Sequence, residues 1–292
     1  MERTFPRILR RVWRLTDPRT RTSRHNDALG EPTPQQRFST LRGDYWVCAR
    51  TGHLTREEVP PRPEDLIPLY DGWWSDLVAK GPPPLRDADA RKRFLARFAP
   101  YRKTGRLFEV GSGLGEMLKI AREVGWEAEG NELSGVAARF AAEFSGSRVH
   151  AGPIESVTLE DGVFDVIVLK NVFEHFESPA RVLAKLARAL RPGGALFLQT
   201  LNAQSLSLYV NPRGWTHFIE GHLHVPTLMS LSHYFRRAGL RVVRIETHGF
   251  TTKSKPKREE NEKWRRFIDR WVANVASRFR LGHRVIVYLE RA

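Results

Sequence analysis

The amino-acid sequence predicts an α/β fold in which helices cover both faces of a mostly parallel, doubly wound sheet. From Asp87 onward, short apolar runs alternate with segments of helical periodicity, which is typical of consecutive strand–helix–strand units. A glycine-rich loop from Gly111 to Gly115 joins the first of these runs to the helix that follows. The 292 residues are 41% hydrophobic, which is enough for one main domain with added pieces.

The predicted elements follow one another along the core in a regular order. Seven strands are expected, at residues 106–110, 127–131, 148–150, 163–169, 195–200, 241–246 and 284–289. Four helices are expected, at residues 116–124, 135–144, 180–190 and 227–238. The third helix has the strongest boundary signals, because Ser178 suits an N-cap and Pro179 suits the first helical position. Pro192-Gly193-Gly194 is expected to end it.

Prolines divide the N-terminal third of the chain from this core. Pro18, Pro32 and Pro34 predict one short helix followed by irregular chain, and Pro82-Pro83-Pro84 ends the segment because successive prolines cannot continue a helix. We therefore expect four parts. They are a basic N-terminal helix with a small irregular module at 1–84, a core at 85–252, a basic amphipathic helix at 253–281 and a last core strand at 282–292.

Composition narrows the class of protein. No apolar stretch approaches the roughly 20 residues that span a bilayer, and the basic N-terminus lacks the apolar run of a secretory signal. Cys48 is the single cysteine, so neither an intramolecular disulfide nor a multi-cysteine metal cluster can form. These features predict a cytoplasmic protein.

The net charge of +15 is concentrated at the two ends of the chain. Residues 1–60 hold 12 Lys and Arg against 7 Asp and Glu, and residues 241–292 hold 14 against 6. Apolar and aromatic residues recur at helical spacing within 5–13 and 264–279, with basic residues between them. Such helices either pack on the core or lie on an anionic membrane surface, which would make the protein peripheral to the inner membrane. Nucleic-acid binding is the least favoured partner class, because the central part is almost neutral.

The glycine-rich loop is the main functional signal. Its spacing is G-x-G-x-G, and Glu116 stands where the dinucleotide fingerprint needs a final glycine, which argues against NAD. Glu132 follows the second predicted strand, about 20 residues beyond the glycines, where a carboxylate accepts hydrogen bonds from ribose hydroxyls. The structural alternative is that Glu132 caps the helix that begins near Ser134.

With these motifs the region around residues 60–250 resembles the class I S-adenosylmethionine-dependent methyltransferases. The resembling segments are Glu109–Gly115, Phe164–Leu169, Asn171–His175, Leu190–Gly194 and Thr200–Asn202. The resemblance implies a Rossmann-like, seven-stranded sheet with an antiparallel last strand, and S-adenosyl-L-methionine as cofactor. The cofactor-binding residues that it implies are Glu109, Gly111, Ser112, Gly113, Gly115, Glu132, Leu133 and Asn171.

Two departures from related proteins bear on metals. Many relatives end an N-terminal zinc module in C-x-x-C-G, whereas Cys48 is here followed by Gly52 without the second cysteine. We expect this module to be held by packing of its aromatic residues instead, namely Tyr45, Trp46, Tyr70, Trp73 and Trp74. Ubiquinone-pathway O-methyltransferases carry E-x-x-E-H after the fourth strand, but Asn171 replaces the first carboxylate. The sequence therefore predicts no metal.

Two histidines are the candidate catalytic bases. His175 follows a central strand at the end where open α/β sheets bind ligands, although Glu174 and His175 could instead serve the structure of the next turn. His222 lies in a loop that, in relatives, covers the acceptor. His217 and His224 flank it, but their spacing on a loop does not favour zinc.

These residues predict a methyltransferase acting on oxygen. The expected acceptor is a small-molecule, glycan or lipid-linked hydroxyl, and the sequence leaves the oligomeric state open. An RNA methyltransferase is one alternative, although Leu169-Lys170-Asn171-Val172 stands where a base-methylating enzyme has an N-P-P-Y-like tetrapeptide. A cofactor-binding scaffold without catalysis is the other alternative.

Overall fold

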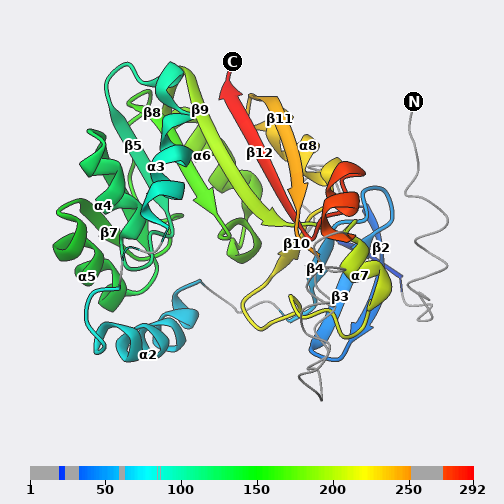
Figure 1. The fold of residues 1–292 in the computed structure, drawn as a ribbon. Coiled ribbons are helices and arrows are strands. Elements are labelled where there is room, and N and C mark those ends of the chain that lie inside the picture. Colours follow the sequence, from blue (N-terminus) through cyan, green and yellow to red (C-terminus); the bar gives the residue numbers. More distant parts are fainter. Residues whose placement is uncertain (1–19, 24–32, 59–62, 84, 86, 251–271) are drawn as a thin grey trace.

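A seven-stranded sheet forms the main body of the protein in a computed structural model that describes residues 20–23, 33–58, 63–83, 85, 87–250 and 272–292 (Figure 1). Its strand order is β11-β12-β9-β8-β5-β6-β7. The strands are β5 (Arg106–Val110), β6 (Glu127–Glu132), β7 (Arg148–Ala151), β8 (Phe164–Lys170), β9 (Leu190–Leu201), β11 (Leu240–His248) and β12 (Arg284–Arg291). Strands β5 to β9 pair in parallel, and β12 runs antiparallel to both of its neighbours, β9 and β11. The predicted sheet with its antiparallel last strand is confirmed.

Strand β9 begins earlier than the sequence indicated. It starts at Leu190 rather than Ala195, so Pro192-Gly193-Gly194 lies inside the strand instead of in a turn. The register with β8 shifts between Phe164 and Val166, and this irregularity accommodates a proline that cannot donate a ladder hydrogen bond. The preceding helix correspondingly ends at Ala189.

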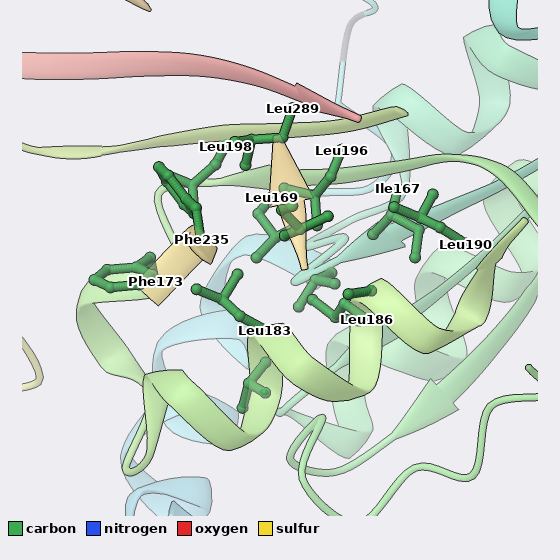
Figure 2. Packing of buried hydrophobic residues seen from close by; sticks show 14 of the residues in the cluster. Ile167, Leu169, Phe173, Leu183, Leu186, Leu190, Leu196, Leu198, Phe235 and Leu289 are labelled. Carbon is green, nitrogen blue, oxygen red and sulfur yellow. The ribbon is translucent and has the colours of Figure 1, made fainter. Parts of the chain in front are cut away.

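Helices cover both faces of the main sheet. Helices α3 (Ala88–Ala96) and α4 (Glu116–Glu123) bury apolar side chains against one face, and α5 (Gly135–Ser145) packs beside α4. Helices α6 (Pro179–Ala189) and α8 (Leu228–Arg237) cover the other face. Figure 2 shows Leu183 and Leu186 of α6 directed at Leu196, Leu198 and Leu289 of the strands. The apolar positions at helical spacing are therefore the ones that form this core.

The N-terminal region is a sheet, which corrects the expected irregular module. Strands β1 (Thr20–Ser23), β2 (Thr33–Thr40), β3 (Gly43–Cys48) and β4 (Leu54–Arg56) pair antiparallel. Strand β10 (His224–Val225), which lies in the chain after β9, completes this sheet beside β4. Prolines near the start of β2 had argued against a strand, but proline is tolerated there.

The N-terminal sheet is fixed to the core by a shared apolar cluster. It contains Phe38, Tyr45, Val47, Leu54, Leu201, Ala203, Leu208, Trp215, Phe218 and Val225. Helix α7 (Leu206–Val210) supplies Leu208. Tyr45 belongs to this cluster and Trp46 is buried, as expected, whereas the other three aromatic residues assigned to this module lie on α2 (Ile67–Val78), away from the sheet. The domain divisions at residues 84, 252 and 281 stay a prediction.

The two predicted basic amphipathic helices fall largely outside the described residues. Residues 5–13 and 264–271 lie in those parts, and helix is seen only at residues 272–278. Among the helices that the structure describes, none is long and apolar enough to cross a membrane.

Candidate functional site

A cavity of about 670 Å³ opens where β5, β6 and β8 end. The chain leaves β5 toward β6 on one side, while β8 pairs on the other side, so the cavity lies where the strand order reverses. Four segments supply most of its wall: the loop after β5, the loop after β6, the end of β8 with its following loop, and α2. Residues 219 and 222 close the remaining side.

Two positions of the glycine-rich loop that face the cavity require glycine. Gly111 and Gly113 have φ angles of 68° and 54°, in the left-handed region that other residues avoid. A Cβ on Gly111 would lie 2.3 Å from Cγ1 of Val172, and one on Gly113 would lie 3.2 Å from Cη2 of Trp74. The loop therefore presents bare backbone to the cavity at the start of α4.

Glu132 is directed at the glycine-rich loop. Its Oε2 accepts a hydrogen bond from the Gly113 N–H at 2.9 Å, and its Oε1 accepts one from the Ser134 N–H at 3.2 Å. The N-cap of α5 is Ser134, whose hydroxyl accepts a hydrogen bond from the Ala137 N–H at 3.1 Å. The alternative that Glu132 caps this helix is therefore wrong. Burial raises the pKa of Glu132, and the backbone donors partly offset it. The remaining oxygen lone pairs are available to hydroxyl donors in the cavity.

Glu109 is the most perturbed carboxyl of the cavity wall. Burial raises its pKa to about 8, against the opposing effects of Lys170 and Arg91. Its Oε2 is buried without a hydrogen-bond partner, and the same holds for Ser112 Oγ and Asn131 Oδ1 among the described residues. Buried polar atoms are rarely left unpaired, so these three atoms fit a polar ligand that would pair with them.

Helix α2 forms a wall of the cavity, whereas the sequence predicted that its aromatic residues pack inside the N-terminal module. Trp73 and Trp74 line the cavity, and the buried Nε1 of Trp74 has no acceptor in the part of the chain that the structure describes. Asp71 holds the helix in place, because it accepts hydrogen bonds from the Ser134 hydroxyl and, at 3.4 Å, from the Val136 N–H. The sequence signal that could have indicated this role is the pair of adjacent tryptophans, and in the structure α2 buries none of its residues fully.

His175 has a ring nitrogen available as a base. Its Nδ1 lies 2.7 Å from the Gly221 carbonyl oxygen, which can only accept, so Nδ1 carries the proton. The Tyr70 hydroxyl lies 3.3 Å from the same nitrogen. In the neutral imidazole, Nε2 then carries a lone pair.

His222 has the same tautomer but a different environment. Its Nδ1 donates to the His217 carbonyl oxygen at 2.7 Å. Burial, together with the nearby His175, lowers the pKa of His222 to about 3. The two rings lie 4.8 Å apart, centroid to centroid, and both line the cavity. The structure thus brings both candidate bases to one place, and its low pKa makes His222 a poor proton acceptor.

The other histidines of that loop point elsewhere. The His217 ring stacks on His283, with centroids 4.9 Å apart. His224 Nδ1 lies 3.0 Å from Nε2 of the fully buried His53. The three loop histidines therefore share no common site.

A different trio meets the geometric needs of a metal. Glu174, His175 and His222 each place one ligand atom within 4.8 Å of the others. Glu174 is also hydrogen-bonded, because its Oε2 accepts from the Thr200 hydroxyl at 2.8 Å. One carboxylate is few for Mg²⁺, whereas two histidines and one glutamate are a set that can hold Zn²⁺, so metal independence stays a prediction.

Asn171 and Leu133 complete the predicted set, and both line the cavity. Asn171 has a φ of 58°, and its Oδ1 accepts hydrogen bonds from Gln199, at 2.9 Å, and from Arg284. Its amide is thus held toward β9 and β12. The structure brings all the predicted site residues except Gly115 to the cavity wall, and Gly115 is the N-cap of α4 just behind it.

Comparison with known proteins gives matches in the same region. A family model described as a methyltransferase domain matches residues 86–245. The chain is 30% identical over 156 residues to a ubiquinone biosynthesis O-methyltransferase of Burkholderia thailandensis, covering 48% of this chain and 66% of that protein. It is 34% identical over 110 residues to a tRNA U34 carboxymethyltransferase of Syntrophotalea carbinolica, covering 36% and 33%. The chain spans less than two thirds of either relative.

Solved structures share the fold at low identity. A chain from the complex between the Haloferax volcanii Trm112 methyltransferase activator and a methyltransferase aligns with a TM-score of 0.54 and 19% identity, covering 80% of this chain and 99% of that one. The [4+2]-cyclase SpnF aligns with the same TM-score and identity, covering 80% and 97%. Identities this low show the fold alone, and one of these proteins is named for a different reaction.

Proposed function

Because this chain belongs to the class I S-adenosylmethionine-dependent methyltransferases, we propose that it transfers a methyl group to a hydroxyl oxygen of a small-molecule, glycan or lipid-linked acceptor. The observation that carries this proposal is one cavity with two unlike halves. One half has the bare glycine loop with Glu109 and Glu132, and the other has His175 with an unprotonated Nε2. The oxygen acceptor is also in keeping with the name of the Burkholderia relative.

The acidic half fits S-adenosylmethionine. The unpaired atoms of Glu109, Ser112 and Asn131 suit a ligand with ammonium and hydroxyl groups, and Glu132 suits the ribose hydroxyls. When bound, S-adenosylmethionine supplies a methyl group already activated on a sulfonium. Trp74 lies beside Gly113 in the wall of this half.

The histidine half would handle the acceptor proton. His175 Nε2 takes the proton of the acceptor hydroxyl as the oxygen gains the methyl group, and the Gly221 carbonyl holds the ring in the required tautomer. Alignment of the two reactants supplies most of the rate, because the methyl group needs no further activation. His222, with a pKa of about 3, would contact the acceptor as a neutral ring.

A labelling experiment tests the proposed function. The purified protein is incubated with S-adenosylmethionine carrying a labelled methyl group and a metabolite extract, and products heavier by one labelled methyl group are sought by mass spectrometry. We expect such a product from the wild type and strong loss with Glu132→Ala, because the ribose contact is removed. The matched control is Glu129→Ala on the same strand, whose carboxylate pairs with Arg106 at 2.6 Å. Binding of NAD without binding of S-adenosylhomocysteine would contradict the assignment.

Binding of S-adenosylmethionine should release a proton from Glu109. With a pKa of about 8, this carboxyl is mostly protonated at pH 7, and a cationic ligand favours its charged form. We expect release of close to one proton per chain at pH 7, measured by calorimetry in buffers of different ionisation enthalpy. The release should fall above pH 8 and vanish in Glu109→Gln. Equal heats in all buffers at pH 7 would contradict this role of Glu109.

Methyl transfer should not need a metal. We expect activity to survive exhaustive treatment with EDTA, because Asn171 supplies no second carboxylate beside Glu174 for Mg²⁺, and we expect elemental analysis to find less than stoichiometric zinc. Loss of activity on chelation, restored by Mg²⁺ or Zn²⁺, would place a metal at that trio.

RNA is a second candidate acceptor, which the name of the Syntrophotalea relative favours. Labelled methyl groups recovered in the RNA fraction of the same incubation would support it.

Attachment to a membrane through helices at the two ends of the chain is a separate proposal. It concerns residues outside the described part and predicts salt-sensitive binding to anionic vesicles.

A further inference from the structure

A row of basic side chains lies beside the histidine half of the cavity. Lys170 ends β8, Arg284 begins β12 and His248 ends β11. Lys170 pairs in register with Gln199 of β9, and Arg284 pairs with Leu201, two residues further along β9. Arg284 is also in register with His248. Paired residues project from the same face of a sheet. The three side chains therefore lie on one face of the sheet, at the end where β8 and β11 finish and β12 begins.

Neither Lys170 nor Arg284 is neutralised by a carboxylate. Lys170 is exposed, lines the cavity and makes no ion pair with any described residue. The Arg284 guanidinium donates to the amide oxygen of Asn171, which also lines the cavity, and among described residues it has no carboxylate partner. The nearest acidic groups do not change this. Glu246 is paired with Arg244 at 2.5 Å, and Glu109 makes no ion pair with Lys170 or Arg284 in the described part of the chain.

The positive charge of Lys170 and Arg284 affects the pKa of the surrounding histidines. Burial is the main cause of the lowered pKa of His222, His248 and His283, and Arg284 lowers all three further. Lys170 also lowers the pKa of His248. Basic groups that repel one another beside a cavity attract an anion, and the attraction is strong where water is partly excluded.

We propose that the acceptor carries an anionic group, a carboxylate or a phosphate ester, which binds to Lys170 and Arg284 while the hydroxyl to be methylated lies at His175. This inference rests on the proposed function and specifies its substrate class. The cavity is then divided by charge. The cationic donor lies at Glu109 and Glu132, and the anionic part of the acceptor lies at the opposite side.

Binding of simple anions tests the inference without knowledge of the acceptor. The protein is saturated with S-adenosylhomocysteine and titrated by calorimetry with inorganic phosphate and, separately, with benzoate. We expect saturable binding of one of the two at millimolar order, and the anion that binds tells phosphate esters from carboxylates. Lys170→Met and Arg284→Met should each weaken this binding at least about 10-fold, whereas Arg284→Lys should restore part of it. The control is Lys103→Met. Lys103 is exposed and precedes β5, at the opposite end of the strands from the cavity.

Each other outcome has a definite meaning. The inference is overturned if the wild type binds neither anion, or if both Met variants bind as tightly as the wild type. Retained binding of S-adenosylhomocysteine in the variants separates this failure from failure of the proposed function. A short oligouridine that binds more tightly than phosphate, and is lost in both Met variants, would overturn the small-molecule form and indicate RNA.

Discussion

Alanine in place of His175 lowers methyl-transfer turnover by about 10²- to 10⁴-fold, because no group then takes the acceptor proton in the transition state. The affinity for S-adenosylhomocysteine should stay nearly unchanged, since the glycine loop and Glu132 are untouched. Turnover is measured on the product found in the labelling experiment, and cofactor affinity is measured by calorimetry. His222→Ala should cost less, because a ring with a pKa of about 3 is a poor proton acceptor.

His233→Ala on α8 is the control for His175→Ala. His233 is partly buried outside the cavity, and its ring contacts Arg236 at 2.9 Å. Full turnover in both His175→Ala and His222→Ala would show that neither histidine is the base. Full turnover in His175→Ala alone would move the role to His222.

Alanine in place of Asp165 destabilises the protein by about 3–5 kcal/mol, the usual cost of removing one partner of a buried ion pair. The Asp165 side chain is fully buried at the start of β8 and pairs with Arg191 at 2.5 Å. Its Oδ2 also accepts hydrogen bonds from the backbone N–H groups of residues 103, 104 and 105, at 2.7 to 2.8 Å. The variant leaves all these donors and a guanidinium without their acceptor. Urea denaturation measures the loss.

The matched control is Asp161→Ala. Its carboxylate is exposed and lies 3.7 Å from Arg188, so the free energy of unfolding should change by less than about 1 kcal/mol.

The pH dependence of the free energy of unfolding gives a second check on the role of Asp165. Burial alone would raise the pKa of Asp165, but Arg191 and the three backbone donors outweigh it and lower the pKa. This stabilisation is therefore complete above the ordinary aspartate pKa of about 4 and is lost as the pH falls through the lower folded value. Equal stability of Asp165→Ala and the wild type at pH 7 would contradict the account.

The core could be predicted because its local signals agree with its tertiary structure. The first strand was placed at its observed bounds, since an apolar run there ends at a glycine turn. The start of β9 was missed because a bulge, which depends on the neighbouring strand, lets proline and two glycines remain in the ladder. The N-terminal sheet was missed for a similar reason. Its inner side chains are buried by Trp215 and Phe218, which lie more than 150 residues away along the chain. A local sequence pattern cannot predict a contact between segments so far apart.

Some features of the candidate site could likewise be predicted from the sequence, and others could not. Gly113 and Glu132 are related by a fixed spacing along one strand–helix–strand unit, so sequence alone could place them together. The lowered pKa of His222 could not be predicted, because it arises from burial and from neighbouring rings. Nor could the position of Trp74, because the approach of α2 to the glycine loop depends on the contact between Asp71 and Ser134.

The location of β12 restricts how the protein can be shortened. This strand comes last in the chain but lies between β9 and β11, which pairs with no other strand of the sheet. A truncation after residue 252 would leave β11 without a neighbour and would turn β9 into a long, apolar open edge able to pair with other chains. It would also remove Arg284. A catalytic fragment for expression or for fusion to another protein therefore has to keep the C-terminal strand, even though most of the cavity wall is complete by residue 222.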